Sequence, residues 1–191
     1  MDMSAREHGG SSTLTRDQIL KALESLSEEL GKRGVTGEIC LFGGTAMVLA
    51  FSARPATRDV DAIFQPAQLV RELARQIAEQ HALAPDWLND AVKGFVSTHH
   101  EVTAGNLPQF PHLRVTMPVP EYPLAMKCMA ARIAATAGET SDLADIRFLV
   151  RHLALNSAKA VLDLVAKYYP VERIPVRAQY VIEGLFEEGR S

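Results

Sequence analysis

The chain has 191 residues, enough for one well-buried domain or for a domain with a helical annex. Its net charge of −3 excludes a uniformly basic surface, so any nucleic acid would have to bind a local patch. The two cysteines lack CxxC or Cys/His spacing, which favours a cytoplasmic protein without a disulfide or a zinc site. No apolar run approaches the roughly 20 residues of a bilayer span, so we expect no membrane contact. Residues 1–13 are polar and we expect them to form a flexible tail.

The first half of the chain alternates helical and strand patterns. Thr15 to Gln18 has the form of a capping box, and apolar residues follow at helical spacing until Gly31. Pro66 suits the first turn of a later helix. The expected elements, in order, are a helix from 15, a strand over 38–42, a short helix over 45–52, a strand over 59–64, a helix after 66, a short helix opening at 87–90, and strands over 95–103 and 113–117.

The second half is helical throughout. After Pro118 and Pro120 the pattern predicts four helices, over 124–136, 141–153, 157–168 and 176–187. The sequence therefore predicts an α/β (α+β) fold, with a small mixed-sheet core over 14–118 and a helical subdomain over 119–191 packed on it.

A glycine turn joins the first expected strand to the short helix. Gly43, Gly44 and Thr45 follow an apolar strand, and free backbone N–H groups in such a turn can hold a phosphate. Glycine lets the backbone approach a triphosphate closely, and the threonine hydroxyl can add a hydrogen bond. The alternative is a tight strand-to-helix turn that binds no ligand.

Two aspartates begin the next expected strand. Asp59 and Asp61 are spaced i, i+2, so both point to the same face and can bind a divalent cation. Like charges side by side in a buried element are unfavourable unless a cation neutralises them. In the alternative, Asp59 caps a turn and Asp61 pairs with Arg54 or Arg58. With the glycine turn just upstream, the pattern favours metal-assisted nucleotidyl transfer.

A charged cluster lies in the helical half. Lys127 interrupts an otherwise apolar helix, where a lysine either snorkels or faces an anion. Asp142 and Asp145 are spaced i, i+3 and share a helix face. The alternative is an interhelical ion pair with Lys127 or Arg132, with Asp142 at a helix start.

These segments together resemble a known group. Gly43-Gly44-Thr45, then thirteen residues, then Asp59-Val60-Asp61 matches the signature of DNA polymerase β-type nucleotidyltransferases. Lys127 with Ala130-Ala131-Arg132, and the later segment 142–146, look like the second half of small bacterial AbiEii/AbiGii-type toxin nucleotidyltransferases, which are often encoded in toxin–antitoxin or phage-defence loci. Arg132 is thereby a further candidate site residue. Residues 87–90 are similar to members of the same set, and the resemblance runs from about 39 to 149.

The resemblance implies roles for the residues of the first half. Asp59 and Asp61 would hold one or two Mg²⁺ (or Mn²⁺) ions that bridge the phosphates of an NTP substrate. Gly44 and Thr45 would cradle the β- and γ-phosphates at the helix N-terminus, and Arg58 would be a further phosphate contact.

In the second half, the resemblance implies that Lys127 neutralises charge on the phosphates. Asp145, or Asp142, would position Lys127 or the acceptor. One departure is visible, because many polymerase β-type enzymes present a third carboxylate from a later strand and the expected strand 113–117 carries none. The toxin-like branch manages with the lysine and the helical aspartate.

The expected reaction is transfer of an NMP from an NTP to an acceptor, with release of pyrophosphate. By resemblance the acceptor is an RNA, such as a tRNA 3′ end, or a protein, and a cognate antitoxin is an expected partner. A small hydroxylated acceptor, as in antibiotic-modifying relatives, is an alternative. A further alternative is a non-catalytic nucleotide-binding protein of the same fold, which the missing strand carboxylate favours.

Overall fold

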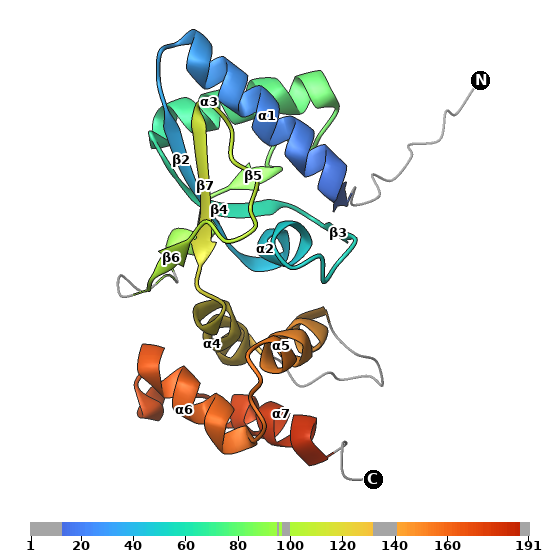
Figure 1. Cartoon of the computed structure of the whole chain (residues 1–191), viewed down its shortest axis with the longest axis vertical. Coiled ribbons are helices and arrows are strands. Elements are labelled where there is room, and N and C mark those ends of the chain that lie inside the picture. Colours follow the sequence, from blue (N-terminus) through green and yellow to red (C-terminus); the bar gives the residue numbers. More distant parts are fainter. Residues whose placement is uncertain (1–12, 95, 97–99, 132–140, 188–191) are drawn as a thin grey trace, which may run out of the picture. The chain divides into compact units, whose positions relative to one another are not determined.

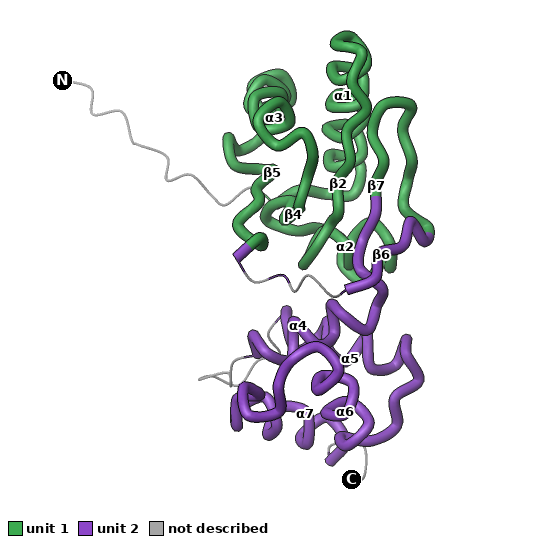
Figure 2. Tube along the Cα trace, turned by 90° about the vertical axis from the view of Figure 1, so that its left-hand side faces the viewer, with its two compact units in different colours: residues 1–93, 106–115 green, residues 94–105, 116–191 purple. Residues whose placement is uncertain are grey.

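The computed structural model describes residues 13–94, 96, 100–131 and 141–187. They form a mixed α/β fold, which confirms the predicted class. The chain divides into two compact units, one of residues 1–93 and 106–115 and one of residues 94–105 and 116–191 (Figure 2).

Five strands form one sheet, in the order β5-β4-β2-β7-β6 (Figure 1). Of these, β5, β4, β2 and the first part of β7 belong to the first unit, whereas β6 and the end of β7 belong to the second. β2 and β4 pair antiparallel, with Leu41 opposite Ala62. β4 and β5 run parallel, with Asp61 opposite Asn89. The strands are β2 (Gly37–Leu41), β4 (Val60–Gln65), β5 (Leu88–Asn89), β6 (Val102–Thr103) and β7 (Leu113–Pro118).

Three helices complete the first unit, namely α1 (Arg16–Lys32), α2 (Gly43–Leu49) and α3 (Ala67–His81). The predicted capping box at the start of α1 is present, because Thr15 N–H donates to Gln18 Oε1 at 2.9 Å and Thr15 Oγ1 accepts from Gln18 N–H. α1 packs on α3, and α3 packs on β4. Trp87 is fully buried and its indole N–H donates to the Ala74 carbonyl at 2.9 Å, as expected of a core anchor.

The second unit is mainly helical. Its helices are α4 (Glu121–Ala130), α5 (Ser141–His152), α6 (Ala158–Tyr168) and α7 (Val176–Glu187). α4 is central, since it packs against each of the other three. Among the residues that the structure describes, no helix combines the length and apolar character needed to cross a membrane.

Two sequence predictions of local structure are wrong. Residues 87–90 are not helical, because Leu88 and Asn89 pair with β4 as the edge strand β5. The expected short helix before Gly94 is present one turn later, as the 3₁₀ helix η1 (Ala91–Gly94). Within the described part of 95–103, only Val102 and Thr103 form a strand. The sequence also missed β1 (Leu14–Thr15) and β3 (Ala56–Thr57), which pair with each other.

The division into units also differs from the predicted boundary after residue 118. Residues 94–105 group with the helical unit, because β6 pairs with Met117 and Pro118, and Val119 N–H donates to the Glu101 carbonyl at 3.0 Å. The expected helix over 124–136 is α4, and its predicted last residues, 132–136, lie outside the described residues.

Candidate functional site

The glycine turn lies directly against the second aspartate. Phe42 N–H donates to the Asp61 carbonyl at 2.8 Å, and α2 begins at the next residue. Gly43 has a φ of +56°, a conformation that disfavours residues with a side chain, and a Cβ placed on it would lie 3.0 Å from Asp61 Oδ2. Gly43 therefore lets the chain turn and lets the Asp61 carboxylate approach the turn.

Gly44 is close to a different neighbour. A Cβ on Gly44 would lie 2.4 Å from Thr57 Oγ1 and 3.5 Å from Arg54 Nη1. Thr57 belongs to β3, which packs on α2. Packing against Thr57 is therefore one reason for the absence of a side chain at Gly44.

The Thr45 side chain connects the turn to the first aspartate. It is fully buried, and Oγ1 donates a hydrogen bond to the Asp59 carbonyl at 2.9 Å. This hydroxyl thus fixes the backbone at Asp59. Thr45 therefore joins the glycine turn to the aspartate pair, although Thr45 and Asp59 are fourteen residues apart in the sequence.

Asp59 is held by a residue that the sequence analysis missed. Asn89 Nδ2 donates to Asp59 Oδ2 at 3.1 Å, and Asn89 Oδ1 accepts from the Ala91 N–H at 3.1 Å. The Ala91 contact orients the Asn89 amide so that its NH₂ group faces the carboxylate. The sequence analysis did not select Asn89, because a helix at 87–90 would have placed this residue away from β4. The available signal for a strand was the position of Asn89 directly after the apolar pair Trp87-Leu88.

The two carboxylates are only partly buried. Asp59 immediately precedes β4, and Asp61 alternates with the buried Val60 and Ala62. Both side chains thus remain partly exposed beside the turn, whereas the sequence suggested a buried pair. Arg58 is exposed in the connection before β4.

These oxygens fit a hard divalent cation whose remaining ligands come from water and substrate. Carboxylate oxygens suit Mg²⁺, which is usually held by one or two carboxylates together with substrate phosphates. Within residues 13–94, 96, 100–131 and 141–187, no three His, Cys, Asp or Glu side chains gather as a metal cluster. Asp59 and Asp61 are therefore better suited to a cation that binds together with a nucleotide than to a cation held by protein ligands alone.

The lysine cluster lies in the second unit. Lys127 Nζ is 2.6 Å from Asp145 Oδ2 and 3.1 Å from Asp142 Oδ1. The Lys127 and Asp145 side chains are 12% and 2% exposed, whereas Asp142 is 53% exposed, so Asp145 is the buried partner. This is the interhelical ion pair that the sequence offered as the structural alternative. Arg132 lies outside the described residues.

No protein-family model, no curated protein and no solved structure matches the chain. A function can therefore only be proposed, from the residues, their geometry and the resemblance of the sequence motifs.

Proposed function

We propose that this protein is a Mg²⁺-dependent nucleotidyltransferase of the cytoplasm that moves an NMP from an NTP to an RNA or protein acceptor. The observation that carries the proposal is the contact between the glycine turn and the aspartate pair. Gly43 lies against Asp61, and Thr45 Oγ1 donates to the Asp59 carbonyl. A phosphate-binding turn and a carboxylate pair must be adjacent if one nucleotide is to contact both.

The proposed binding roles follow from the groups at this place. Asp59 and Asp61 would hold Mg²⁺, and Asn89 would keep the Asp59 carboxylate oriented toward it. The backbone at Gly43 and Gly44 would face the phosphates. Bound Mg²⁺ would supply charge neutralisation at the triphosphate.

The proposed reaction is an in-line displacement at the α-phosphorus. A hydroxyl oxygen of the acceptor forms the new bond to phosphorus, and the bond from phosphorus to the α,β-bridging oxygen breaks. Pyrophosphate leaves with that electron pair, and the acceptor proton passes to solvent. The protein's contribution is mainly positioning and charge stabilisation, which is the usual contribution in this class of reaction.

Lys127 enters the proposal through the resemblance only. In the structure its charge is matched by Asp145 and Asp142 within the helical unit. We assign it the neutralisation of phosphate charge, with Asp145 as the residue that positions it. A cognate antitoxin partner rests on the same resemblance.

Nucleotide binding is tested by isothermal titration of the protein with Mg²⁺ and an ATP or GTP analogue that cannot be cleaved between the α- and β-phosphates. We expect binding that requires Mg²⁺ and is lost in Asp59→Asn/Asp61→Asn. Asp86→Asn, at an exposed acid of the same unit, is the matched control and should bind normally. Unchanged binding by the double variant would contradict the proposal.

The stability of the metal-free double variant separates a metal site from a structural ion network. Removing two neighbouring like charges relieves repulsion, so the midpoint of thermal unfolding should stay the same or rise. A fall in that midpoint would indicate that the aspartates serve the fold. Binding of nucleotide without transfer to any acceptor would favour the non-catalytic alternative, and transfer only to a small hydroxylated compound would favour the antibiotic-type one.

A further inference from the structure

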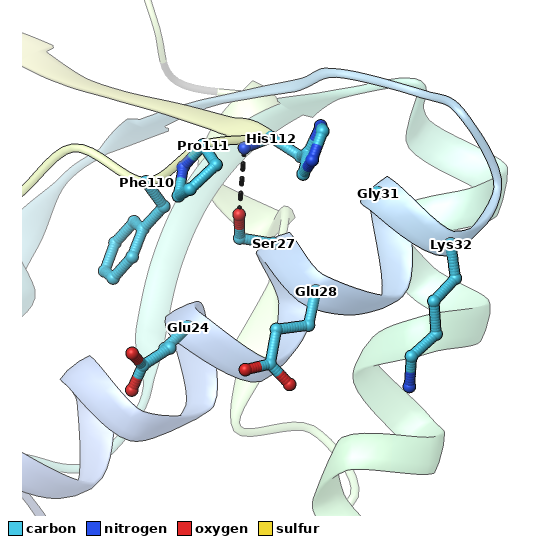
Figure 3. A pocket seen from close by; sticks show the side chains of 8 residues that line it. All are labelled: Glu24, Ser27, Glu28, Gly31, Lys32, Phe110, Pro111 and His112. Atoms are coloured by element: carbon cyan, nitrogen blue, oxygen red, sulfur yellow. Dashed lines mark hydrogen bonds between the residues drawn. The ribbon is translucent and has the colours of Figure 1, made fainter.

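A groove of about 380 Å³ lies between α1 and the turn before β7 (Figure 3). Glu24 and Glu28 line its α1 wall. Lys21 precedes this pair by one helical turn and Lys32 follows it by one, and Lys32 Nζ also contacts Glu29 Oε1 at 2.6 Å. Acidic and basic groups thus alternate along this wall, so the groove selects no charge class of ligand. The side chains around the glycine turn, by contrast, indicate the chemistry of a ligand.

Two side chains of the segment between α2 and β4 lie beside Gly44. A Cβ placed on Gly44 would be 3.5 Å from Arg54 Nη1, and Thr57 Oγ1 is closer still. At the neighbouring Gly43, the nearest atom to such a Cβ is Asp61 Oδ2, at 3.0 Å. A guanidinium, a hydroxyl and a candidate metal-binding carboxylate therefore gather at two consecutive glycines.

Thr57 brings a buried hydroxyl to this turn. The residue is 8% exposed, and its Oγ1 points at Gly44. Within the described ranges of the chain, this hydroxyl has no hydrogen-bond partner, whereas the buried Thr45 donates to the Asp59 carbonyl. A buried polar group without a partner is unfavourable for stability. The position of the Thr57 hydroxyl therefore suits a ligand that brings a hydrogen-bond acceptor to the turn.

The segment that carries these two side chains is fixed at both ends. Ala53 N–H donates to the Met47 carbonyl of α2 at 2.9 Å. Thr57 and the residue before it form β3, which pairs with β1. Arg16, directly after β1, donates through Nη1 to the Leu49 carbonyl at the end of α2, at 2.6 Å. The backbone is thus in place before a ligand binds, which reduces the ordering cost of binding.

The charges of the candidate site leave a triphosphate without enough positive charge. One Mg²⁺ would only offset the carboxylates of Asp59 and Asp61. Lys127 belongs to the other unit and contacts two aspartates there. Arg54 lies at the turn itself, and a guanidinium has five N–H donors. A contact of Arg54 with Asp61, which the sequence also allows, would therefore leave donors for a phosphate.

We propose that Arg54 and Thr57 bind the β- and γ-phosphates of the NTP at the glycine turn. This inference rests on the proposed nucleotidyltransferase function and adds two residues to its phosphate site. The guanidinium and the hydroxyl would donate charge-assisted hydrogen bonds to phosphate oxygens. The same contacts would stabilise the pyrophosphate as it leaves and its negative charge increases. Both residues would therefore make the protein prefer a nucleoside triphosphate to a monophosphate.

The test compares the Kd of the uncleavable ATP or GTP analogue with the Kd of the matching nucleoside monophosphate, in the presence of Mg²⁺. The monophosphate keeps the base, the sugar and the α-phosphate. Isothermal titration measures the analogue, and competition with the analogue measures the weaker monophosphate. The variants are Arg54→Met, Arg54→Lys, Thr57→Val and Thr57→Ser. Arg75→Met, at an exposed arginine of α3, is the matched control.

We expect Arg54→Met to raise the Kd of the triphosphate analogue about ten- to hundredfold, as the loss of charge-assisted hydrogen bonds predicts. The Kd of the monophosphate should stay nearly the same. Arg54→Lys should keep part of the preference for triphosphate, because it retains the charge and loses the planar fork. Thr57→Val should raise the Kd of the analogue about two- to tenfold, and Thr57→Ser should restore it. Arg75→Met should bind both ligands like wild type.

Three results would contradict the inference, and they differ in what else they affect. An equal loss of both ligands in Arg54→Met would show that Arg54 supports the fold and not the phosphates. A preference for triphosphate that survives in Arg54→Met, while binding of Mn²⁺ alone becomes tighter by electron paramagnetic resonance, would mean that Arg54 only neutralises Asp61. Both results leave the proposed function intact. Absence of Mg²⁺-dependent binding of the analogue to the wild-type protein would instead contradict the proposed function, and this inference with it.

Discussion

At the scale of single residues, the candidate site depends on side chains that hold the carboxylates in place. Asn89 is the clearest of these, since its amide bridges Asp59 and the Ala91 N–H. Thr45 acts from the other side through the Asp59 carbonyl. Residues in such supporting positions affect a metal site without contacting the metal.

Replacement of Asn89 by alanine should lower Mg²⁺-dependent nucleotide binding by about 10–100-fold, because Asp59 loses the hydrogen bond that orients it. The free energy of unfolding should fall by only about 1 kcal/mol, the usual value for one hydrogen bond. Titration calorimetry and urea unfolding measure the two effects. Asp90→Ala, at the next residue, removes the ion pairs with Arg71 and Lys93 and should leave nucleotide binding unchanged. A loss of binding no larger in Asn89→Ala than in that control would show that Asn89 does not support the site.

Lys127 and Asp145 allow a second prediction at this scale. Asp145→Ala leaves a largely buried ammonium without its nearest partner, so the free energy of unfolding should fall by about 3–5 kcal/mol. The double variant Lys127→Met/Asp145→Leu should be much closer to wild type, since it removes both charges from the interior. Urea unfolding of Lys127→Met, Asp145→Leu and the double variant gives the coupling energy. If the losses in free energy of unfolding of the single variants add up in the double variant, the ion pair is not the source of the destabilisation.

At the scale of elements, the turn between β2 and α2 is fixed by close packing. The 2.4 Å distance from a Gly44 Cβ to Thr57 Oγ1 is shorter than any normal contact. α2 and β3 therefore can approach as they do only with glycine at this position.

Gly44→Ala should destabilise the protein by about 1–3 kcal/mol, because the added methyl group clashes with Thr57. Thr57→Ala removes the hydroxyl in question, so the double variant should recover part of the loss. A double-mutant cycle by thermal or urea unfolding measures this coupling. If Gly44→Ala instead leaves stability intact but abolishes nucleotide binding, close approach of phosphate, and not packing, explains this glycine.

Long periodic elements were predictable from the sequence, and short ones were not. The capped α1, with its apolar stripe, and β4, with alternating burial, follow from local periodicity. β5 and β3 are two residues each, too short to show a period, and exist because of the strands they pair with. Asn89 was not predicted because it lies in such a short strand. Gly43 and Asp61 were predicted because a glycine turn and a pair of aspartates can be recognised from the residue types alone.

At the scale of the whole molecule, the predicted site residues fall in two compact units. The glycine turn, Arg58 and the aspartate pair belong to the unit of residues 1–93 and 106–115, and Lys127, Asp142 and Asp145 belong to the other. The sequence predicted each group by its spacing. It could not decide between an ion pair and a phosphate ligand for Lys127, because both need the same residues.

The most direct test of the account is a transfer assay with each NTP labelled at the α-phosphate, in the presence of Mg²⁺ and either total RNA or a protein extract. The γ-labelled NTP is run in parallel, because pyrophosphate should carry that label away. We predict that the α-label alone enters an RNA or protein band, and that transfer disappears in Asp59→Asn/Asp61→Asn but persists in Asp86→Asn. Transfer of the γ-label, or equal transfer by the double variant, would contradict the proposed function.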